Sequence, residues 1–398
     1  MRVMKDSGVE WLGEVPAGWE LHRAKRLFKL TNDRGNDSLT LLAATQKYGM
    51  WPQDRLEGVV RVKDDADLSK FRTVHKNDYV ISLRSFQGGF ERSDFEGVCS
   101  PAYQTFRAIT PIDYQYFKYL FKSPSFIDHM NSLTLGIREG KTIKFDDFAT
   151  QVLPVPPIDE QCRIAGYLDE KCAEIARAIS AAERSIEEFL SFRSSRLEET
   201  VTSIVKTASH KKLKYVLVES KEKSVDGIGE PLSITIARGV LRSSDLNIPN
   251  PTSSLIGAKI VHEGDLVFNK LKAYFGVMYV SPFDGLISPE YAIYRAIDDQ
   301  KVSLKYLEYV FHTAKVIDEF KIRISGVADG FRRLYTSDLF DIAVPVPMRP
   351  EQDAVVKELN ALYSDIDAAV AAKQAIIADL KAYKQSLIYE AVTGKREV

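Results

Sequence analysis

Two long stretches of the chain place their apolar residues on a single helical stripe. Each stretch follows a Pro-Val-Pro segment, at 154–156 and again at 345–347, and its apolar positions then alternate between steps of four and three. Such heptads predict coiled-coil helices, here over 154–206 and 345–398. The apolar positions are Ile164, Leu168, Cys172, Ile175, Ile179, Ala182, Ile186, Phe189, Leu197 and Val201 in the first stretch, and Val355, Leu359, Ile366, Val370, Ile377, Leu380 and Leu387 in the second. Helices of about forty residues are ~60 Å long, more than one small domain can cover, so we expect them to pair with each other.

The regions before these helices show a different pattern. Residues 21–153 and 207–344 mix short β-rich runs, such as "DYVISL" and "DLVFN", with turns such as "SPFDG". Each region also contains one helical pattern, "YQYFKYLFKS" in the first and "LKYLEYVFHT" in the second. This mixture predicts two α+β globular domains, and a short N-terminal segment, 1–20, precedes the first of them.

The sequence contains an internal repeat, in which one long unit occurs twice. The run "FDDFATQVLPVPPIDEQ" at 145–161 returns as "TSDLFDIAVPVPMRPEQ" at 336–352, with the Pro-Val-Pro and Glu-Gln elements in register. Upstream, "GVCSPAYQTFRAI" matches "GLISPEYAIYRAI", "VHKNDYVIS" matches "VHEGDLVFN", and "TQKYGM" matches "TIARGV". We therefore expect two copies of one scaffold, each followed by its own long helix.

Composition and charge narrow the possible classes. The 398 residues are 45% hydrophobic, enough for packed cores, and the formal net charge is −1. The helical stretches carry an excess of acidic residues and the globular regions a small excess of basic ones, an asymmetry that suits contact between the domains and a polyanion. Cys99, Cys162 and Cys172 have no metal-ligand spacing, and no run is long and apolar enough to span a bilayer, so the sequence predicts a reduced, cytoplasmic protein.

The stretch "GIREGKTIKF" at 136–145 resembles a nucleotide-binding loop but lacks its spacing. Gly136 and Gly140 enclose three residues, whereas a P-loop needs four between its glycines. The second copy, "GVADGFRRLY", keeps both glycines and loses the Lys-Thr pair. A turn that leads into the next element explains this pattern, and a basic loop that contacts a polyanion is the functional alternative.

Taken together, these motifs resemble the specificity subunit of type I restriction–modification enzymes. The resemblance spans essentially the whole chain and is carried by "SGVEWLGEVPAGWELHRAKRLF", "NKLKAYFG", "ISPEY", "PVPPIDEQ", "YEAVTGK" and their duplicated order. It implies two target recognition domains, antiparallel spacer helices with a pseudo-two-fold internal repeat, and a double-stranded DNA target read in two halves. It also implies methyltransferase subunits, two of them, and restriction/translocase subunits as partners. These partners would hold S-adenosylmethionine, ATP and Mg, and this subunit would hold no cofactor.

Matched loops supply the candidate DNA-contacting residues, chosen because Arg, Lys, Gln and Asn can reach groove edges or phosphates. For each of them a solvated surface charge is the alternative. In the first domain the candidates are Gln46, Lys47, Arg84, Gln87, Arg138, Lys141 and Lys144; in the second they are Arg238, Lys270, Lys272, Arg332 and Arg333.

No catalytic constellation is apparent in the sequence. His75 and His262 recur in register beside a turn without a partner that would make them catalytic, and the Glu-x-Lys at 219–221 has no equivalent in the first copy. We therefore expect a non-catalytic DNA recognition subunit. Two other classes stay open, a standalone nuclease or methyltransferase and a coiled-coil adaptor that binds protein without DNA.

Overall fold

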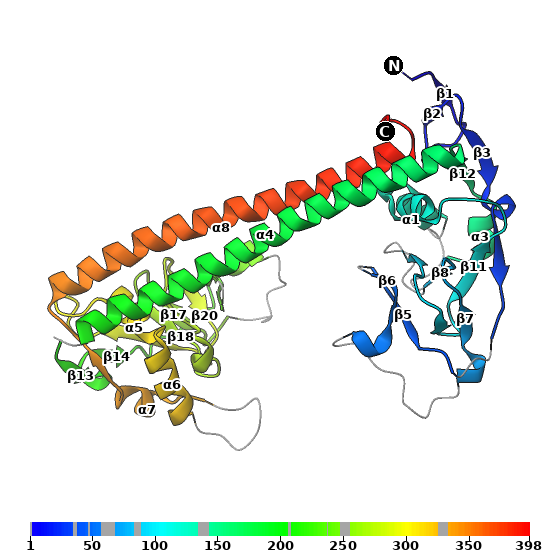
Figure 1. Cartoon of the computed structure of the whole chain (residues 1–398). Coiled ribbons are helices and arrows are strands. Elements are labelled where there is room, and N and C mark those ends of the chain that lie inside the picture. Colours follow the sequence, from blue (N-terminus) through cyan, green and yellow to red (C-terminus); the bar gives the residue numbers. More distant parts are fainter. Residues whose placement is uncertain are drawn as a thin grey trace. The chain divides into compact units, whose positions relative to one another are not determined.

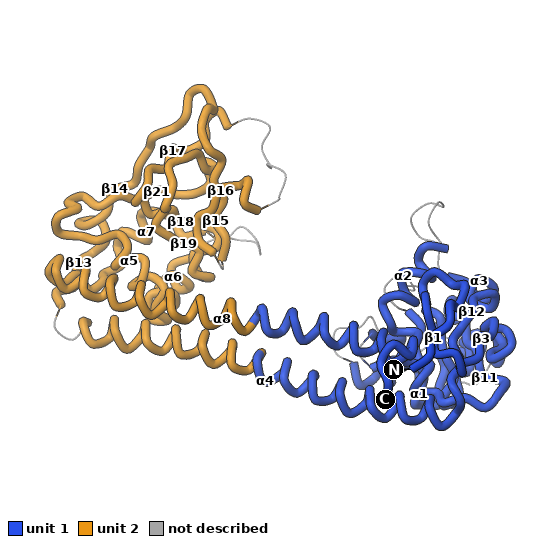
Figure 2. The backbone as a smooth tube through the Cα atoms, turned by 90° about the horizontal axis from the view of Figure 1, so that it is seen from above, with its two compact units in different colours: residues 1–182, 374–398 blue, residues 183–373 orange. Residues whose placement is uncertain are grey.

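The chain divides into two compact units, residues 1–182 with 374–398 and residues 183–373, coloured blue and orange in Figure 2. The structure is a computed structural model that describes residues 2–34, 38–46, 48–56, 68–82, 89–133, 143–205, 208–236, 238–246, 255–324 and 333–398. Each unit contains one α+β domain together with part of each of two long helices, α4 (Ile158–Val205) and α8 (Arg349–Val392). The two α+β domains are called domain 1 and domain 2 below.

Domain 1 is built on a four-stranded antiparallel sheet in the order β4-β11-β8-β9, of which Figure 1 labels β8 and β11. Three two-stranded sheets, β3-β12, β7-β10 and β5-β6, complete it, and β1-β2 precedes it. The strands are β1 (Met4–Asp6), β2 (Glu14–Pro16), β3 (Glu20–Arg23), β4 (Phe28–Thr31), β5 (Leu42–Thr45), β6 (Gly49–Pro52), β7 (Arg72–Val74), β8 (Tyr79–Ile81), β9 (Phe90–Arg92), β10 (Gly97–Cys99), β11 (Gln104–Ala108) and β12 (Val152–Val155). The helices are α1 (Tyr114–Lys122), α2 (Pro124–Ser132) and α3 (Phe145–Ala149).

Domain 2 repeats this topology strand for strand. Its four-stranded sheet has the order β14-β21-β18-β19, and its two-stranded sheets are β13-β22, β17-β20 and β15-β16. The strands are β13 (His210–Lys212), β14 (Leu217–Glu219), β15 (Leu232–Thr235), β16 (Gly239–Arg242), β17 (Lys259–Val261), β18 (Leu266–Phe268), β19 (Met278–Val280), β20 (Gly285–Ile287), β21 (Ala292–Ala296) and β22 (Ala343–Pro345). The helices are α5 (Leu304–Phe311), α6 (Ala314–Arg323) and α7 (Thr336–Phe340). The predicted duplication of an α+β scaffold is confirmed.

The first helix after the sheet shows why the two sequences fold alike. Asp113 caps α1 by accepting a hydrogen bond from the Tyr116 N–H at 2.7 Å, and Ser303 caps α5 by accepting one from the Tyr306 N–H at 3.3 Å. Each helix then buries an aromatic face against its own sheet. In domain 1 this core is a cluster of rings that includes Phe28, Tyr79, Phe106, Phe117, Phe121 and Phe148.

Within each unit, α4 and α8 run side by side in opposite directions (Figures 1 and 2). In the second unit Arg193 pairs with Asp367 at 2.9 Å and Arg196 pairs with Glu358 at 2.9 Å, so the residue numbers rise along α4 as they fall along α8. The predicted heptad positions Leu168, Leu359 and Leu387 are fully buried. Among the central positions Ala182 is buried, whereas Ile186, Phe189, Val370 and Ile377 are half-buried.

A glutamine at the start of each long helix ties that helix to its own domain. Gln161 is buried; its side chain accepts the Asp113 N–H at 2.9 Å and donates to the Pro156 carbonyl at 2.9 Å. Gln352 accepts the Ser303 N–H at 2.8 Å and donates to the Lys301 and Pro347 carbonyls. The repeated Glu-Gln element is therefore a helix anchor, because its amide satisfies backbone groups on both sides of the junction.

The end of α8 packs on the N-terminal segment of the first unit. Val392 shares a core with Trp11 and Trp19, and the Lys395 ammonium donates to the Leu12 carbonyl at 3.0 Å. Gly394 has a φ of +74° and lies so close to Pro16 that an added Cβ would be 2.4 Å from its ring. The "YEAVTGK" motif is therefore explained by close packing.

Candidate nucleic-acid interface

The β5-β6 and β15-β16 hairpins present the same tip in both domains. In domain 1 the Thr45 hydroxyl donates to the Gly49 carbonyl at 3.0 Å and accepts the Tyr48 N–H at 3.0 Å. In domain 2 the Thr235 hydroxyl accepts the Arg238 N–H at 3.0 Å, and Gly239 has a φ of +71°, close to the +73° of Gly49. The backbone of the tip is thus conserved between the copies of the scaffold while its side chains differ.

A concave surface in domain 2 lies beside this hairpin. It has a volume of about 660 Å³ and brings together three segments singled out in the sequence, the "TIARGV" tip, the "NKLKAYFG" loop and the "SPEY" turn. Its lining residues are Ile234, Thr235, Ile236, Asn269, Leu271, Lys272, Val277, Ser288, Glu290 and Tyr291. Lys272 is exposed here, where an anionic backbone could reach its ammonium group.

Two predicted cations from distant parts of the chain meet next to this surface. The Leu334 N–H donates to the Lys270 carbonyl at 3.0 Å, which places Arg333 beside Lys270. The guanidinium of Arg333 pairs with Glu290 at 2.8 Å, and the ammonium of Lys259 pairs with Glu219 at 3.2 Å. Burial, reinforced by the nearby charges of Lys259 and Arg333, lowers the pKa of Lys270. The cluster carries three cations near two carboxylates, so it favours an anion without being strongly basic.

The remaining predicted contacts divide into described and undescribed positions. Gln46 lies exposed in the β5-β6 turn, and the residue at the position of Arg238 is Tyr48. Lys144 is exposed and precedes α3, where its backbone N–H donates to Asp147 at 3.2 Å. Six further candidates lie outside the described residues; they are Lys47, Arg84, Gln87, Arg138, Lys141 and Arg332.

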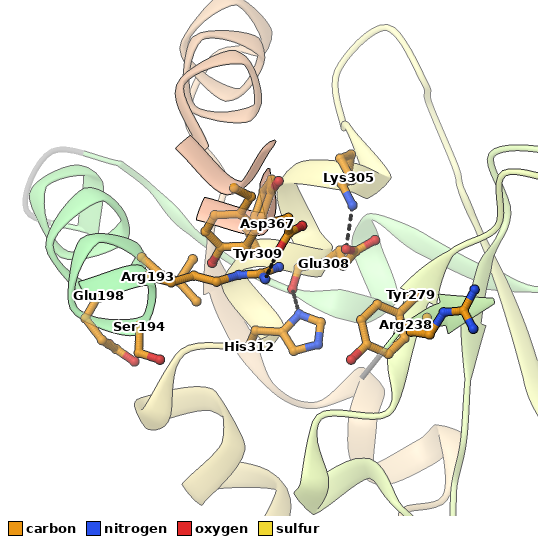
Figure 3. A pocket seen from close by; sticks show the side chains of 13 residues that line it. Arg193, Ser194, Glu198, Arg238, Tyr279, Lys305, Glu308, Tyr309, His312 and Asp367 are labelled. Carbon is orange, nitrogen blue, oxygen red and sulfur yellow. Dashed lines mark hydrogen bonds and ion pairs between the residues drawn. The ribbon is translucent and has the colours of Figure 1, made fainter. Parts of the chain in front are cut away.

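A second cleft lies where domain 2 meets the two long helices (Figure 3). Its volume is about 610 Å³, and Arg193 and Asp367 form an ion pair in it while the Arg193 guanidinium stacks 3.8 Å from the Tyr363 ring centre. Glu308 is buried; it pairs with Lys305 at 2.6 Å and accepts the Val280 N–H at 2.7 Å. Arg238 of the β15-β16 hairpin also lines this cleft. Since Arg193 pairs with Asp367 and Lys305 pairs with Glu308, we interpret the rest of the cleft as a junction between domain 2 and the helices.

The Tyr279 side chain connects this junction to the hairpin tip. Its hydroxyl donates to the Ile236 carbonyl at 2.5 Å, and its ring lies 5.0 Å from the His312 ring. His312 is fixed in turn, with ring nitrogens 2.8 Å from the carbonyl oxygens of Glu308 and Gly276. A chain of contacts therefore runs from α5 to the exposed tip.

His75 and His262 have a structural explanation. Asp78 and Asp265 each accept the backbone N–H of the histidine three residues earlier at 2.9 Å, and each is held by two hydrogen bonds from an arginine, Arg107 or Arg295. The histidine rings are exposed and lie against carboxylates. The recurrent "H-x-x-D" pattern thus closes a turn and orients a buried ion pair.

Sequence reasoning missed several residues of this surface. Ile236, Asn269 and Tyr291 line the concavity, and Tyr279 supports the tip, yet none was a candidate. The matched runs "TIARGV" and "SPEY" contained the signal, because residues that differ between copies on an identical backbone are candidates for specificity. Among the described residues no group of three or more His, Cys, Asp or Glu side chains could hold a metal ion. In the same portion of the chain, no helix has the length and apolar character needed to cross a bilayer.

Comparison with known proteins agrees with this arrangement. Residues 16–182 match the family model of the type I restriction modification DNA specificity domain. The whole chain also has the fold of solved structures from such systems. One, described as showing complex assembly and conformational transition of the type I R-M system, has a TM-score of 0.69 at 16% identity and covers 95% of this chain and 98% of its own.

Another solved structure is the HsdS subunit from Thermoanaerobacter tengcongensis, with a TM-score of 0.53 at 16% identity and coverage of 98% of this chain and 100% of its own. No curated protein matches the sequence. Residues 16–182 are thus similar to the type I restriction modification DNA specificity domain, and the whole chain has the fold of the solved HsdS subunit. The resemblance drawn from the duplicated motifs is confirmed.

Proposed function

We propose that this chain is the non-catalytic, sequence-specific DNA recognition subunit of a type I restriction–modification complex. Each domain reads one half of a bipartite site, and the two halves differ. The observation that carries the proposal is the pair of hairpins with the same backbone and different tips, Gln46 and Tyr48 in one and Ile236 and Arg238 in the other. A shared scaffold with divergent exposed side chains is what two readers of different sequences require.

The long helices set the distance between the half-sites in this proposal. Gln161 fixes the start of α4 to domain 1, and Gln352 fixes the start of α8 to domain 2. A change in the length of the helices should therefore change the spacing between the half-sites. The exposed surfaces of the assembly bind methyltransferase subunits and restriction/translocase subunits, which bring S-adenosylmethionine, ATP and Mg. The two solved relatives come from such systems, which supports this assignment of partners.

The test combines partner capture with selection of bound DNA. The tagged chain is expressed in its host, and the subunits that co-purify with it are identified by mass. The purified assembly then selects from random double-stranded DNA, and the bound fraction is sequenced. The proposal predicts two defined sequence blocks separated by a fixed number of unspecified base pairs. An assembly that enriches no sequence, with no methyltransferase among its partners, would favour an adaptor that does not bind DNA.

A matched pair of insertions tests the helices as a ruler. The Arg193–Asp367 pair shows which positions lie opposite each other, so one heptad is added after Ser191 and one after Asp367. Each insertion keeps the apolar stripe in phase and lengthens the helix by roughly 10 Å, about three base pairs. The expected result is unchanged sequence blocks with a longer gap. An unchanged gap would refute the ruler while leaving DNA recognition intact.

A further inference from the structure

The tip of the β15-β16 hairpin carries two exposed side chains, the apolar Ile236 on the concave surface and the cationic Arg238 on the neighbouring cleft. Ile236 is 54% exposed, so most of its apolar side chain is available for contact with a partner. Arg238 is also exposed, and its guanidinium has no hydrogen-bond or ion-pair partner among the described residues. This distinguishes it from Arg333, which pairs with Glu290.

The backbone beneath these two side chains is fixed. Thr235 accepts the Arg238 N–H at 3.0 Å, and the Tyr279 hydroxyl donates to the Ile236 carbonyl at 2.5 Å. Gly239 adopts a φ of +71°, and an added Cβ there would lie 3.2 Å from the Tyr279 ring, so the tip rests directly on that ring. A tip held in this way does not pay the ordering cost of a free loop when it binds.

The shape of the hairpin suits a DNA groove. β15 and β16 form a two-stranded ribbon whose strands pair over four residues each. The major groove of B-DNA admits a two-stranded ribbon, and within it a guanidinium can donate two hydrogen bonds to guanine O6 and N7. An apolar side chain can meanwhile contact the methyl group of thymine.

We infer that Arg238 specifies a guanine in the half-site read by domain 2, with Ile236 against a neighbouring thymine methyl group. The inference rests on the proposed function and extends it from DNA to particular bases. Lys272, exposed beside Ile236 on the concave surface, anchors the adjacent phosphate backbone. Domain 1 carries Tyr48 at the matching position, so its half-site lacks this guanine contact.

The experiment compares bases selected by three variants of the full chain, together with any subunits that co-purify with it. Bound sequences from random double-stranded DNA are compared for the unaltered chain, Arg238→Ala and Arg238→Gln. With Arg238→Ala, one guanine of the second block should become degenerate, with discrimination falling by roughly 5- to 150-fold, the equivalent of about 1–3 kcal/mol. With Arg238→Gln the preference should move toward adenine, because a glutamine amide pairs with adenine N6 and N7.

Arg242→Gln is the matched control. Arg242 lies in the same hairpin and is exposed, but its guanidinium is placed over the Phe283 ring at 4.7 Å. The Arg242→Gln substitution should leave every selected base unchanged. The first sequence block should be unchanged in all variants, which separates a local change in reading from a loss of the assembly.

Two results would overturn the inference. One is an unaltered second block with Arg238→Ala. The other is an equal loss of affinity for all sequences, which would make Arg238 a phosphate contact. Failure of the proposed function is recognised separately, because the unaltered chain would then select no bipartite sequence at all.

Discussion

Domain 1 and domain 2 support their hairpins with different chemistry at matching positions. In domain 2 the hairpin rests on Tyr279, whose ring meets His312. In domain 1 the corresponding residues of the sheet and of the first helix are Glu91 and Lys122, which form a buried ion pair near Gly49. The scaffold thus keeps the position of the support and changes its chemistry from a ring contact to a charge pair.

Other contacts are the same in both domains. The Asp78–Arg107 and Asp265–Arg295 pairs have the same two-bond geometry and hold the same turn. Tyr119 donates to Asp169 on α4 at 2.7 Å, and Tyr309 donates to Asn360 on α8 at 2.6 Å. Shared contacts therefore maintain the fold and the attachment of each domain to a helix, whereas the contacts near the hairpin tip have diverged with the tip.

The largest expected effect comes from removing a shared ion pair. Asp78→Ala and Asp265→Ala each leave an arginine that is about one-third exposed without its main partner. We expect each to destabilise its own domain by about 2–3 kcal/mol, at the low end for a broken buried pair because the arginines retain some water. Hydrogen exchange of peptides from each domain measures the two effects separately.

The exposed pair Lys321–Asp318 provides the control for this prediction. Asp318→Ala should change stability by less than about 1 kcal/mol, because exposed ion pairs contribute little. If the losses of stability caused by Asp78→Ala and by Asp265→Ala differ by more than the control effect, the two ion pairs are not equivalent. The scaffold is then less faithfully repeated than the geometry indicates.

The next effect is confined to domain 1 and depends on pH. Burial raises the pKa of Glu91 to about 7, although Lys122 acts in the opposite direction. Since the folded pKa exceeds the unfolded value, the folded domain binds the proton more tightly, and its stability falls as pH rises from about 5 to about 7. We expect the free energy of unfolding of domain 1 to fall by about 1–2 kcal/mol over that pH interval.

Glu91→Gln removes the titration while keeping the shape of the side chain. As pH rises from about 5 to about 7, the unaltered domain 1 should lose stability relative to the Glu91→Gln variant. Domain 2, with Tyr279 in that position, should show no change from this substitution. A pH-independent difference would mean that Glu91 keeps one charge state throughout.

The smallest effect concerns the support in domain 2. Tyr279→Phe keeps the ring and removes the hydrogen bond to the Ile236 carbonyl, which should cost about 1 kcal/mol. We expect the same bases to be selected with weaker discrimination in the second block, because the tip is less firmly positioned. Tyr215→Phe, at an exposed position of domain 2 outside both cavities, is the control for the loss of a tyrosine hydroxyl. Equal discrimination between bases by the unaltered chain and by Tyr279→Phe would show that this hydrogen bond is not needed to position the tip.

Much of the fold could be predicted because its signals are local or repeated. The heptads of α4 and α8 and the duplicated runs do not depend on knowing which distant residues touch, and the buried stripe and matching topologies agree with them. The hairpin support could not be predicted in this way. Tyr279 and Ile236 are 43 positions apart, and nothing in the local pattern around either residue indicates their hydrogen bond.

The candidate site could be predicted only in part, because it also depends on contacts between residues distant in the sequence. Lys270 and Arg333 belong to separate matched loops, and the structure brings them together next to Glu290. Their mutual position depends on long-range packing of Leu334 into the domain 2 core. The pairing of Arg333 with a carboxylate was equally invisible, because charge counts along the chain do not show which cations are already neutralised.

The most direct test of the account replaces domain 1 by a second copy of domain 2, with residues 207–344 in place of 21–153. If each domain is an independent reader on a common scaffold, the purified assembly should select two copies of the second sequence block at the original spacing, with the first block lost. Sequencing of DNA bound by this chain and by the unaltered chain gives the answer in one comparison. Persistence of the first block, or the loss of both blocks in a folded assembly, would contradict the claim that the two domains read separately.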